Sequence, residues 1–232
     1  MKKVAILQSN YIPWKGYFHL IQKADHFVFL DNVQYTTRDW RNRNRIKTPS
    51  GSKWLTIPTN GNKKMMINEV TFINSSWIDK HLKSIRLNYS KTPFFQYYYS
   101  KIKAEYLSKK WENLSKLNQH LIKFISNELG IKTKFYNATD FINATGKNER
   151  LISIIKQLQC DYYITGPAAK DYLNTKLFAD NGITIEIIDY SKYIPYVQPF
   201  GKFEHDVSVL DLLFCVGKNA TNYIWRSNEN SI

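Results

Sequence analysis

The spacing of apolar residues at the start of the chain predicts a strand, a helix and a second strand. Residues 4–8 form a short apolar run that ends at polar Ser9 and Asn10, a pattern typical of a buried strand. Helical spacing follows from near Gly16, and residues 26–30 form a second apolar run that ends at Asp31. Because these elements follow one another so closely, we expect a βαβ unit whose two strands are parallel.

The remainder of the chain continues this alternation, with two interruptions. A hairpin is predicted from residues 44–47 and 54–57, and a helical insertion from the helical spacing over residues 76–130. Further strands are predicted at 69–73, 134–136, 161–165 and 184–188, and further helices at 149–158, from Pro167 and at 208–216. This order predicts a layered α/β fold with a mostly parallel, Rossmann-like sheet, in a single domain over residues 1–232.

The composition limits the classes of protein that the chain can belong to. Apolar residues make up 43% of its 232 residues, enough for a substantial core, so an intrinsically disordered protein is excluded. No apolar stretch approaches the roughly 18 residues of a membrane helix, and the first residues lack the apolar region of a signal peptide. Cys160 and Cys215 lie in or beside apolar runs without metal-ligand spacing, so we expect reduced core thiols and a cytoplasmic, bacterial protein.

The charge is strongly positive, with 33 Lys and Arg against 19 Asp and Glu and a formal net charge of +14. Such a chain attracts nucleic acid, anionic membrane surfaces or phosphorylated small molecules. The charge is spread along the sequence except at residues 38–47, which hold five basic side chains and one acid. That segment points to a site, whereas the overall charge is also explained by a general abundance of lysine.

Polar residues follow the first predicted strand, where open parallel sheets bind their ligands. Glycine at the start of the next helix can expose backbone N–H groups to a phosphate or carboxylate. The alternative is a tight strand-to-helix turn with the aromatic rings packed in the core. The candidate substrate-binding residues of this segment are Gln8, Asn10, Tyr11, Trp14, Gly16 and Tyr17.

The second strand is followed by acids, amides and arginines in alternation. Arginine binds phosphate through two parallel hydrogen bonds, and amides can form hydrogen bonds with hydroxyl groups of the same ligand. Asp31 and Asp39 are candidate general bases for an amine or hydroxyl substrate. The candidate binding residues are Gln34, Arg38, Asn42 and Arg43. The alternative is a solvated edge strand whose charges deter pairing with other sheets.

Two later segments add further candidates. Gly166 precedes Pro167 at a strand–helix junction, which suits an anion or an ordinary turn equally well. Gln198 lies in a Tyr-Val-Gln segment that can line a pocket. Asp211 lies three residues after Ser208 at the start of an apolar helix, a spacing close to that of a capping box.

Several signatures of nucleotide and metal enzymes do not occur in the sequence. It contains no Gly-x-x-x-x-Gly-Lys loop, no Gly-x-Gly-x-x-Gly, no Gly-x-Ser-x-Gly and no clustered His or Cys. The nucleotidylyltransferase signature His-x-Gly-His would fall on Trp14-Lys15-Gly16-Tyr17, where both histidines are missing. We therefore expect no cofactor, no metal site and no adenylylation by that mechanism.

Three runs near the start resemble the WbqC-like protein family. They are Gln8-Ser-Asn-Tyr-Ile-Pro-Trp-Lys-Gly-Tyr-Phe18, Asp31-Asn-Val-Gln-Tyr35 and Arg38-Asp-Trp-Arg-Asn-Arg-Asn-Arg-Ile-Lys47. The resemblance continues at Trp54–Pro58, Gly166-Pro167, Tyr196-Val-Gln198 and Ser208-Val-Leu-Asp211, and so spans nearly the whole chain. His205 lies outside the family pattern, and we assign it no role from the resemblance.

The resemblance implies a role in bacterial surface polysaccharide, including the O-antigen of lipopolysaccharide. It favours a transferase that adds an amino-acid or other acyl group to the amine of a nucleotide-linked amino sugar. Arg38, Arg43 and backbone near Gly16 would then bind the diphosphate, and an aminoacyl-tRNA donor would give the basic surface a second use. The alternatives are an RNA-binding protein without catalysis and an accessory protein that binds a partner enzyme.

Overall fold

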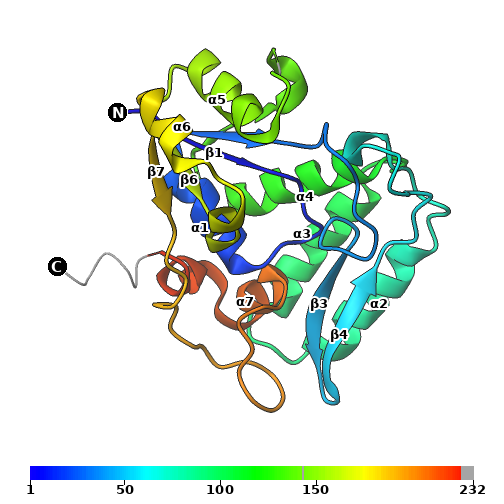
Figure 1. Ribbon diagram of the computed structural model, residues 1–232. Coiled ribbons are helices and arrows are strands. Elements are labelled where there is room, and N and C mark those ends of the chain that lie inside the picture. Colours follow the sequence, from blue (N-terminus) through cyan, green and yellow to red (C-terminus); the bar gives the residue numbers. More distant parts are fainter. Residues whose placement is uncertain (143, 226–232) are drawn as a thin grey trace.

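The computed structural model describes residues 1–142 and 144–225 and contains a five-stranded sheet. Its order is β5 (Lys134–Asn137), β2 (His26–Phe29), β1 (Lys3–Leu7), β6 (Tyr162–Thr165) and β7 (Thr184–Ile187), and every neighbouring pair is parallel (Figure 1). This arrangement confirms the predicted α/β fold and its parallel βαβ start, in which Val4 pairs with His26 and Leu7 with Phe29.

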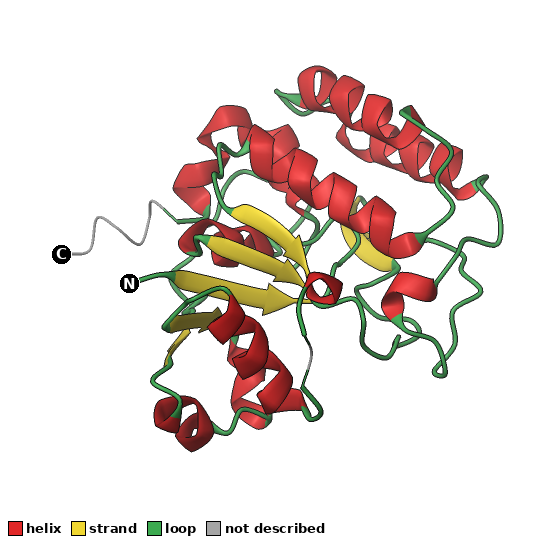
Figure 2. Ribbon diagram, turned by 90° about the horizontal axis from the view of Figure 1, so that it is seen from above, coloured by secondary structure: helices red, strands yellow, loops and turns green. Residues whose placement is uncertain are grey.

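Helices cover both faces of the sheet because its strands are apolar on both sides. Val4 and Ile6 belong to a hydrophobic cluster with α5 (Lys147–Gln157) and α6 (Thr175–Asp180). Ala5 and Phe27 belong to the opposite cluster, with α1 (Lys15–Lys23) and α4 (Leu114–Glu128). Figures 1 and 2 show the resulting layers, with α5 and α6 on one side of the sheet and α1 and α4 on the other.

The predicted hairpin is confirmed and lies beside the sheet as a separate two-stranded unit. It consists of β3 (Arg43–Thr48) and β4 (Gly51–Thr56), in which Arg43 pairs with Thr56 and Thr48 with Gly51. Gly51 has a φ of +99°, a conformation that glycine adopts without strain at this tight turn. Ile46 and Leu55 are buried and join the hairpin to the cluster below the sheet.

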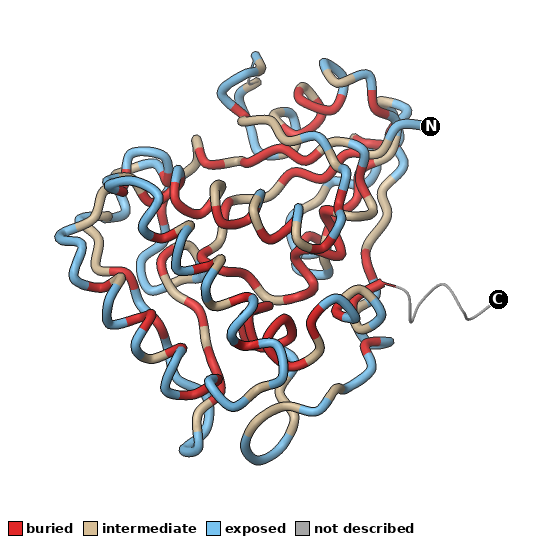
Figure 3. The backbone as a smooth tube through the Cα atoms, turned by 180° about the vertical axis from the view of Figure 1, so that it is seen from behind, coloured by how far each residue is buried: buried red, intermediate tan, exposed pale blue. Residues whose placement is uncertain are grey.

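The helical stretch predicted at 76–130 contains α2 (Trp77–Tyr89), α3 (Phe95–Leu107) and α4. Buried side chains of all three helices share one cluster with the sheet, which supports our proposal of a single domain. Figure 3 shows the buried segments running through the centre, with exposed backbone on the outer turns of the helices.

Two segments differ from the sequence prediction. Residues 69–73 were expected to form a strand, but a 3₁₀ helix, η1 (Ile67–Glu69), occupies its start. Thr71 and Phe72 make only isolated bridges, because the neighbouring loops align with them at single residues. The helix expected from Pro167 is a short 3₁₀ helix, η3 (Pro167–Asp171), and α6 begins at Thr175.

The connections define where a ligand site can form. The chain leaves β1 toward β2 on one side, and it leaves β6 toward β7 on the other. Because β1 and β6 are neighbours, a crevice opens beyond their carboxyl ends, the usual ligand position in such sheets. Two short helices follow near the C-terminus, α7 (Val209–Val216) and η4 (Gly217–Tyr223), and α7 begins beside the loop after β1, where the Val209 N–H donates to the Pro13 carbonyl at 2.9 Å. No helix among residues 1–142 and 144–225 is long and apolar enough to span a membrane.

Candidate functional site

Asp31 ties together the polar segments that follow the first two strands. It is only 4% exposed, and its Oδ1 accepts a hydrogen bond from the Ser9 N–H at 2.8 Å. Its Oδ2 accepts hydrogen bonds from the Ser115 hydroxyl and from Gln119 Nε2, the latter at 3.1 Å. The loop after β1 is thereby fixed to the end of β2 and to α4. Both carboxylate oxygens are engaged, and Asp31 does not line the pocket beside it.

A pocket of about 760 Å³ lies at the carboxyl ends of β1, β2 and β6. Ile6 and Tyr163 form part of its apolar wall, and Gly166 contributes backbone from the end of β6. Its polar wall consists of three amides and three cations, which are Gln8, Asn32, Gln34, Arg41, Lys147 and Arg150. None of the described residues that line this pocket is an aspartate or a glutamate, so its potential favours an anion.

Arg41 is held against the pocket by polar groups from both segments. Its Nη2 donates to Gln8 Oε1 at 3.0 Å, and its Nη1 donates to Asn10 Oδ1 at 3.3 Å. Asp39 Oδ2 lies 3.3 Å from the same Nη1, and its carboxylate also accepts a hydrogen bond from the Trp40 N–H at 2.6 Å. The guanidinium is thus positioned before any ligand arrives, which lowers the entropy cost of binding.

Lys147 and Arg150 supply the other two cations from the first turn of α5. No carboxylate in residues 1–142 or 144–225 lies within ion-pair distance of either side chain. The Nε atoms of Arg150 and Arg41 are buried without a hydrogen-bond partner among the described residues, so a ligand in the pocket would bind the other nitrogens of these guanidinium groups. The positive end of the helix dipole adds to the same field.

Several residues that the sequence analysis singled out lie elsewhere and make internal contacts. The Tyr11 hydroxyl is buried 2.8 Å from His81 Nδ1 and 2.5 Å from the Tyr106 hydroxyl. The Tyr17 hydroxyl donates to the Gln8 carbonyl at 2.9 Å, and Asn42 Nδ2 donates to the Ile57 carbonyl at 3.0 Å.

Gly16 and Gln198 also have internal roles. A Cβ at Gly16 would lie 2.2 Å from the Trp14 ring, so the indole occupies the space expected for a ligand. Gln198 Nε2 donates to Asp211 Oδ1 at 2.9 Å, beside the Tyr196 hydroxyl, which donates to the same oxygen at 2.6 Å. Asp211 is buried, and Ser208 alone caps α7 through the Leu210 N–H.

The structure therefore brings together only part of the predicted set. Gln8, Gln34 and Gly166 share the large pocket, whereas Arg38 and Arg43 do not line it. Arg38 is exposed, and the guanidinium carbon of Arg43 lies 4.1 Å from the centre of the Trp54 ring.

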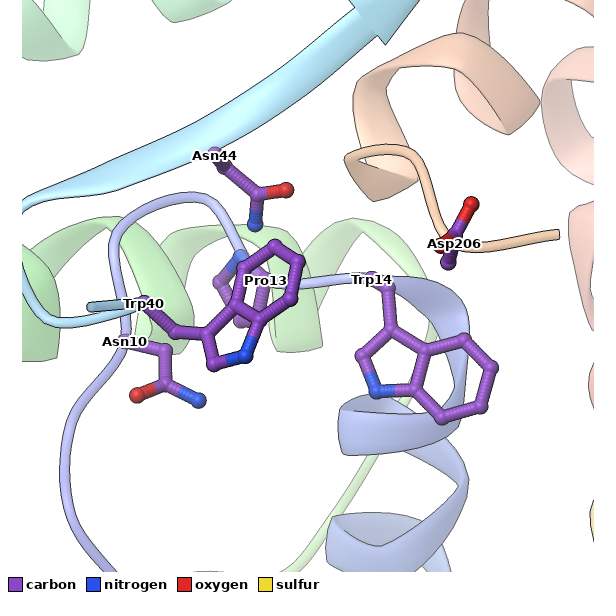
Figure 4. A pocket seen from close by; sticks show the side chains of 6 residues that line it. All are labelled: Asn10, Pro13, Trp14, Trp40, Asn44 and Asp206. Carbon is purple, nitrogen blue, oxygen red and sulfur yellow. The ribbon is translucent and has the colours of Figure 1, made fainter. Parts of the chain in front are cut away.

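Asn10 and Trp14 line a second, smaller pocket of about 180 Å³. Its other lining residues are Pro13, Trp40, Asn44 and Asp206 (Figure 4). In this view the indoles of Trp40 and Trp14 lie apart, with the amides of Asn10 and Asn44 nearer Trp40 and the Asp206 carboxylate nearer Trp14.

Sequence reasoning missed the three cations of the large pocket as individual residues. Arg41 belongs to the alternating segment, but only the structure distinguishes it from Arg38 and Arg43. Lys147 and Arg150 lie more than a hundred residues further along the chain, and their local sequence carries no recognisable motif. The pairing of β1 with β6 brings them to the same edge.

Lys15 is a buried cation beside the second pocket's aromatic wall. Its Nζ lies 4.7 Å from the centre of the Tyr193 ring and 5.5 Å from that of Tyr196, and it has no hydrogen-bond partner. Burial lowers the pKa of Lys15 to about 8, although the Asp211 carboxylate raises it in part. Lys15 therefore loses its proton far more readily than an exposed lysine does.

Among the residues that the structure describes, no group of three or more His, Cys, Asp or Glu could hold a metal ion.

Replacing Asp31 by asparagine should destabilise the fold by about 1–3 kcal/mol, because an amide nitrogen cannot accept the hydrogen bonds that Oδ2 receives. Urea denaturation followed by circular dichroism measures this change. Asp171→Asn is the matched control, since Asp171 is exposed and should change the free energy of unfolding by less than about 0.5 kcal/mol. Equal stability of the Asp31 variant and the parent would contradict the structural role of this carboxylate.

Replacing Lys15 by methionine should raise the free energy of unfolding by about 2 kcal/mol at pH 7, because the charged amine is buried without a hydrogen-bond partner. Between pH 8 and the unfolded pKa of 10.5 the unfolded parent holds more protons than the folded parent, so its stability rises with pH. The advantage of Lys15→Met should therefore be complete below pH 8 and shrink above it.

Denaturation of both proteins at pH 7 and pH 9.5 measures the difference, with Lys80→Met as an exposed-lysine control. A stability difference that does not change with pH would show that Lys15 titrates normally.

Comparison with known proteins identifies the family of the chain. The model of the WbqC-like protein family matches residues 8–223. The chain is 42% identical over 226 residues to the uncharacterized protein Rv1507c of Mycobacterium tuberculosis, a match that covers 97% of this chain and 98% of that protein. No solved structure matches the chain. The chain belongs to the WbqC-like protein family.

Proposed function

We propose that the protein is a transferase that adds an amino-acid or other acyl group to the amine of a nucleotide-linked amino sugar. The product would be used in a bacterial surface polysaccharide such as an O-antigen, the setting that the family resemblance implies. Its two free, buried cysteines suit the reducing cytoplasm in which we propose that it works.

The observation that carries the proposal is the cationic pocket at the carboxyl ends of β1 and β6. Its volume of about 760 Å³ is of the size expected for a small-ligand pocket, within which a nucleotide and a sugar together would fit. In our proposal Arg41, Lys147 and Arg150 bind the diphosphate, because guanidinium and ammonium groups form charge-assisted hydrogen bonds with phosphate oxygens. Gln8, Asn32 and Gln34 then hydrogen-bond the hydroxyl and amide groups of the ligand.

The reaction requires a base, because a sugar ammonium must lose a proton before its nitrogen attacks an acyl carbonyl. We assign this step to Asp39, whose carboxylate contacts Arg41 of the pocket wall and is partly exposed. Asp31 is the second candidate, because it is only 4% exposed. Both carboxylates accept hydrogen bonds inside the protein, and those of Asp39 come from the Thr36 hydroxyl and the Trp40 N–H, but Asp39 is partly exposed. The new C–N bond forms as the carbonyl carbon releases the donor's carrier, which leaves with a proton.

A specific observation also favours the alternative of RNA binding without catalysis. Trp40 and Trp54 are 37% and 38% exposed, and their ring centres lie 5.2 Å apart, at the hairpin that carries Arg43 and Arg45. Exposed aromatic rings among arginines are typical of surfaces that bind single-stranded nucleic acid. Neither ring lines the large cationic pocket, and that pocket supports our choice of the transferase.

Replacing Arg150 by alanine should weaken the binding of UDP-glucosamine and of inorganic pyrophosphate about tenfold or more, because a charge-assisted hydrogen bond is lost. Isothermal titration calorimetry measures both ligands. Arg86→Ala is the matched control, since Arg86 is an exposed arginine of α2 outside this pocket, and it should bind as the parent does. Unchanged binding by the Arg150 variant would remove the diphosphate assignment.

Replacing Asp39 by asparagine should lower the rate of acyl transfer at least a hundredfold while nucleotide-sugar binding changes less than threefold, because the amide cannot accept the ammonium proton. Mass spectrometry of the acylated sugar measures turnover, and calorimetry measures binding. A variant that forms product at the parent's rate would exclude Asp39 as the base.

A further inference from the structure

The two pockets have no lining residue in common, but a side chain of one contacts a side chain of the other. Asn10 lines the smaller pocket, Arg41 lines the larger one, and the Arg41 Nη1 donates to Asn10 Oδ1 at 3.3 Å. Asp39 lines neither pocket, but its carboxylate contacts Arg41 of the larger one and accepts a hydrogen bond from the backbone N–H of Trp40, which lines the smaller one. Ligands in the two pockets would therefore meet across Asn10, Asp39 and Arg41.

The smaller pocket has the chemistry of a site for one planar ring. Its volume of about 180 Å³ is lined by the indoles of Trp40 and Trp14, which lie apart, and by Pro13, Asn10, Asn44 and Asp206 (Figure 4). Trp14 is braced by Tyr190, with ring centres 4.9 Å apart, so it offers a fixed face. Flat aromatic walls favour stacking, and they do so for any base, because every base has a π-face.

Polar groups at the rim of the smaller pocket can form hydrogen bonds with the edge of such a ring. The Asn44 Nδ2 donates hydrogen bonds to the Tyr11 and Ile12 carbonyls, and its Oδ1 accepts one from the Arg45 N–H. Asn44 is therefore a fixed part of the pocket wall. Asn10 keeps its amide nitrogen for a donor bond, and the half-exposed Asp206 carboxylate can accept one from an exocyclic amine.

Two arginines of the hairpin lie beside Trp40 and its neighbour Trp54. Arg43 lies over Trp54, and the guanidinium carbon of Arg45 lies 5.8 Å from the Trp40 ring centre and 5.4 Å from that of Trp54. Arg45 also forms an ion pair with Asp206. Guanidinium groups next to stacking rings provide contacts for the phosphates that follow a bound base.

We propose that this smaller pocket binds the nucleotide end of the acyl donor, with the base between Trp40 and Trp14 and its phosphates toward Arg43 and Arg45. The inference rests on the proposed function, because it assigns the second substrate of that transfer. Two carriers share this chemistry, a small adenine nucleotide and the unpaired 3′ end of an RNA that bears an aminoacyl group.

The position of the pocket suits the transfer. The donor's acyl ester would lie near the contact between Asn10 and Arg41, beside which Asp39 contacts one residue of each pocket. The sugar nitrogen forms the new bond to the carbonyl carbon, the bond from that carbon to the carrier oxygen breaks, and Asp39 takes the ammonium proton. The carrier oxygen leaves with a proton, so atoms and charges balance without a cofactor.

The test measures by isothermal titration calorimetry the binding of two probes, adenosine monophosphate and a single-stranded RNA of six nucleotides ending in CCA. We expect both to bind, with Trp40→Leu reducing affinity about tenfold or more. Tyr97→Leu is the control, because it removes an exposed ring from α3 far from this site and should leave both affinities unchanged. Circular dichroism verifies that the variants are folded.

Comparison of the two probes identifies the carrier. An RNA affinity at least tenfold above that of the mononucleotide, lost in Arg43→Ala and at high salt, assigns the pocket to an RNA-borne donor. Similar affinities assign it to a small nucleotide. If neither probe binds the parent, or if Trp40→Leu binds both as the parent does, the inference is overturned.

The outcome is separable from that of the proposed function. UDP-glucosamine binding should persist in Trp40→Leu, and adenosine monophosphate binding should persist in Arg150→Ala. If Trp40→Leu loses UDP-glucosamine binding while Arg150→Ala still binds adenosine monophosphate, only the sugar site is refuted. If Arg150→Ala loses adenosine monophosphate binding while Trp40→Leu still binds UDP-glucosamine, only the donor site is refuted.

Discussion

The hydrogen bonds to the Asp31 carboxylate hold the functional edge of the sheet in place. They join three parts of the chain that lie far apart in sequence, the loop after β1, the end of β2 and the start of α4. A buried carboxylate is stable only when its oxygens are satisfied, so this arrangement also fixes where the loop after β1 must run. Gln8 and Asn10 then meet Arg41, and the contact between Asn10 and Arg41 joins the linings of the two pockets.

The candidate site favours anions because of where its cations lie, and not because of the net charge of the whole chain. The chain carries a net charge of +14, yet lysines dispersed over a surface attract many partners weakly. In the large pocket three cations face one cavity, and no acid among the described residues lines it. A ligand with two phosphates matches that arrangement better than a single carboxylate does, because it offers several acceptors to several donors.

The sequence pattern predicts the architecture well because apolar runs and helical spacing are local properties. The strands at 4–8 and 26–30, the hairpin and the final helix all appear in the structure within a few residues of their expected positions. The pattern also predicts that the polar ends of β1 and β2 lie at one edge. It does not separate Arg41 from Arg38 and Arg43, because that depends on the direction each side chain takes in a loop. Lys147 and Arg150 could not be found from local sequence, since the crossover from β5 to β6 and the pairing of β6 with β1 bring them to the site.

Local sequence also suggests functions for residues that packing uses otherwise. Gly16 has the position of a phosphate-binding glycine, but the Trp14 ring lies against it. Tyr11 and Gln198 are polar residues in runs that resemble the family. The Tyr11 hydroxyl forms buried hydrogen bonds with His81 and Tyr106, and Gln198 joins the segment before α7 to Asp211. A sequence signature therefore combines the residues of a site with those that hold the site's loops together.

The most direct test of the central claim is a crystal structure of the protein soaked with UDP-glucosamine. The account predicts density for the diphosphate beyond the carboxyl ends of β1 and β6, in contact with Arg41, Lys147 and Arg150. Density for the diphosphate among Trp40, Arg43 and Arg45, with the larger pocket filled by water alone, would contradict it.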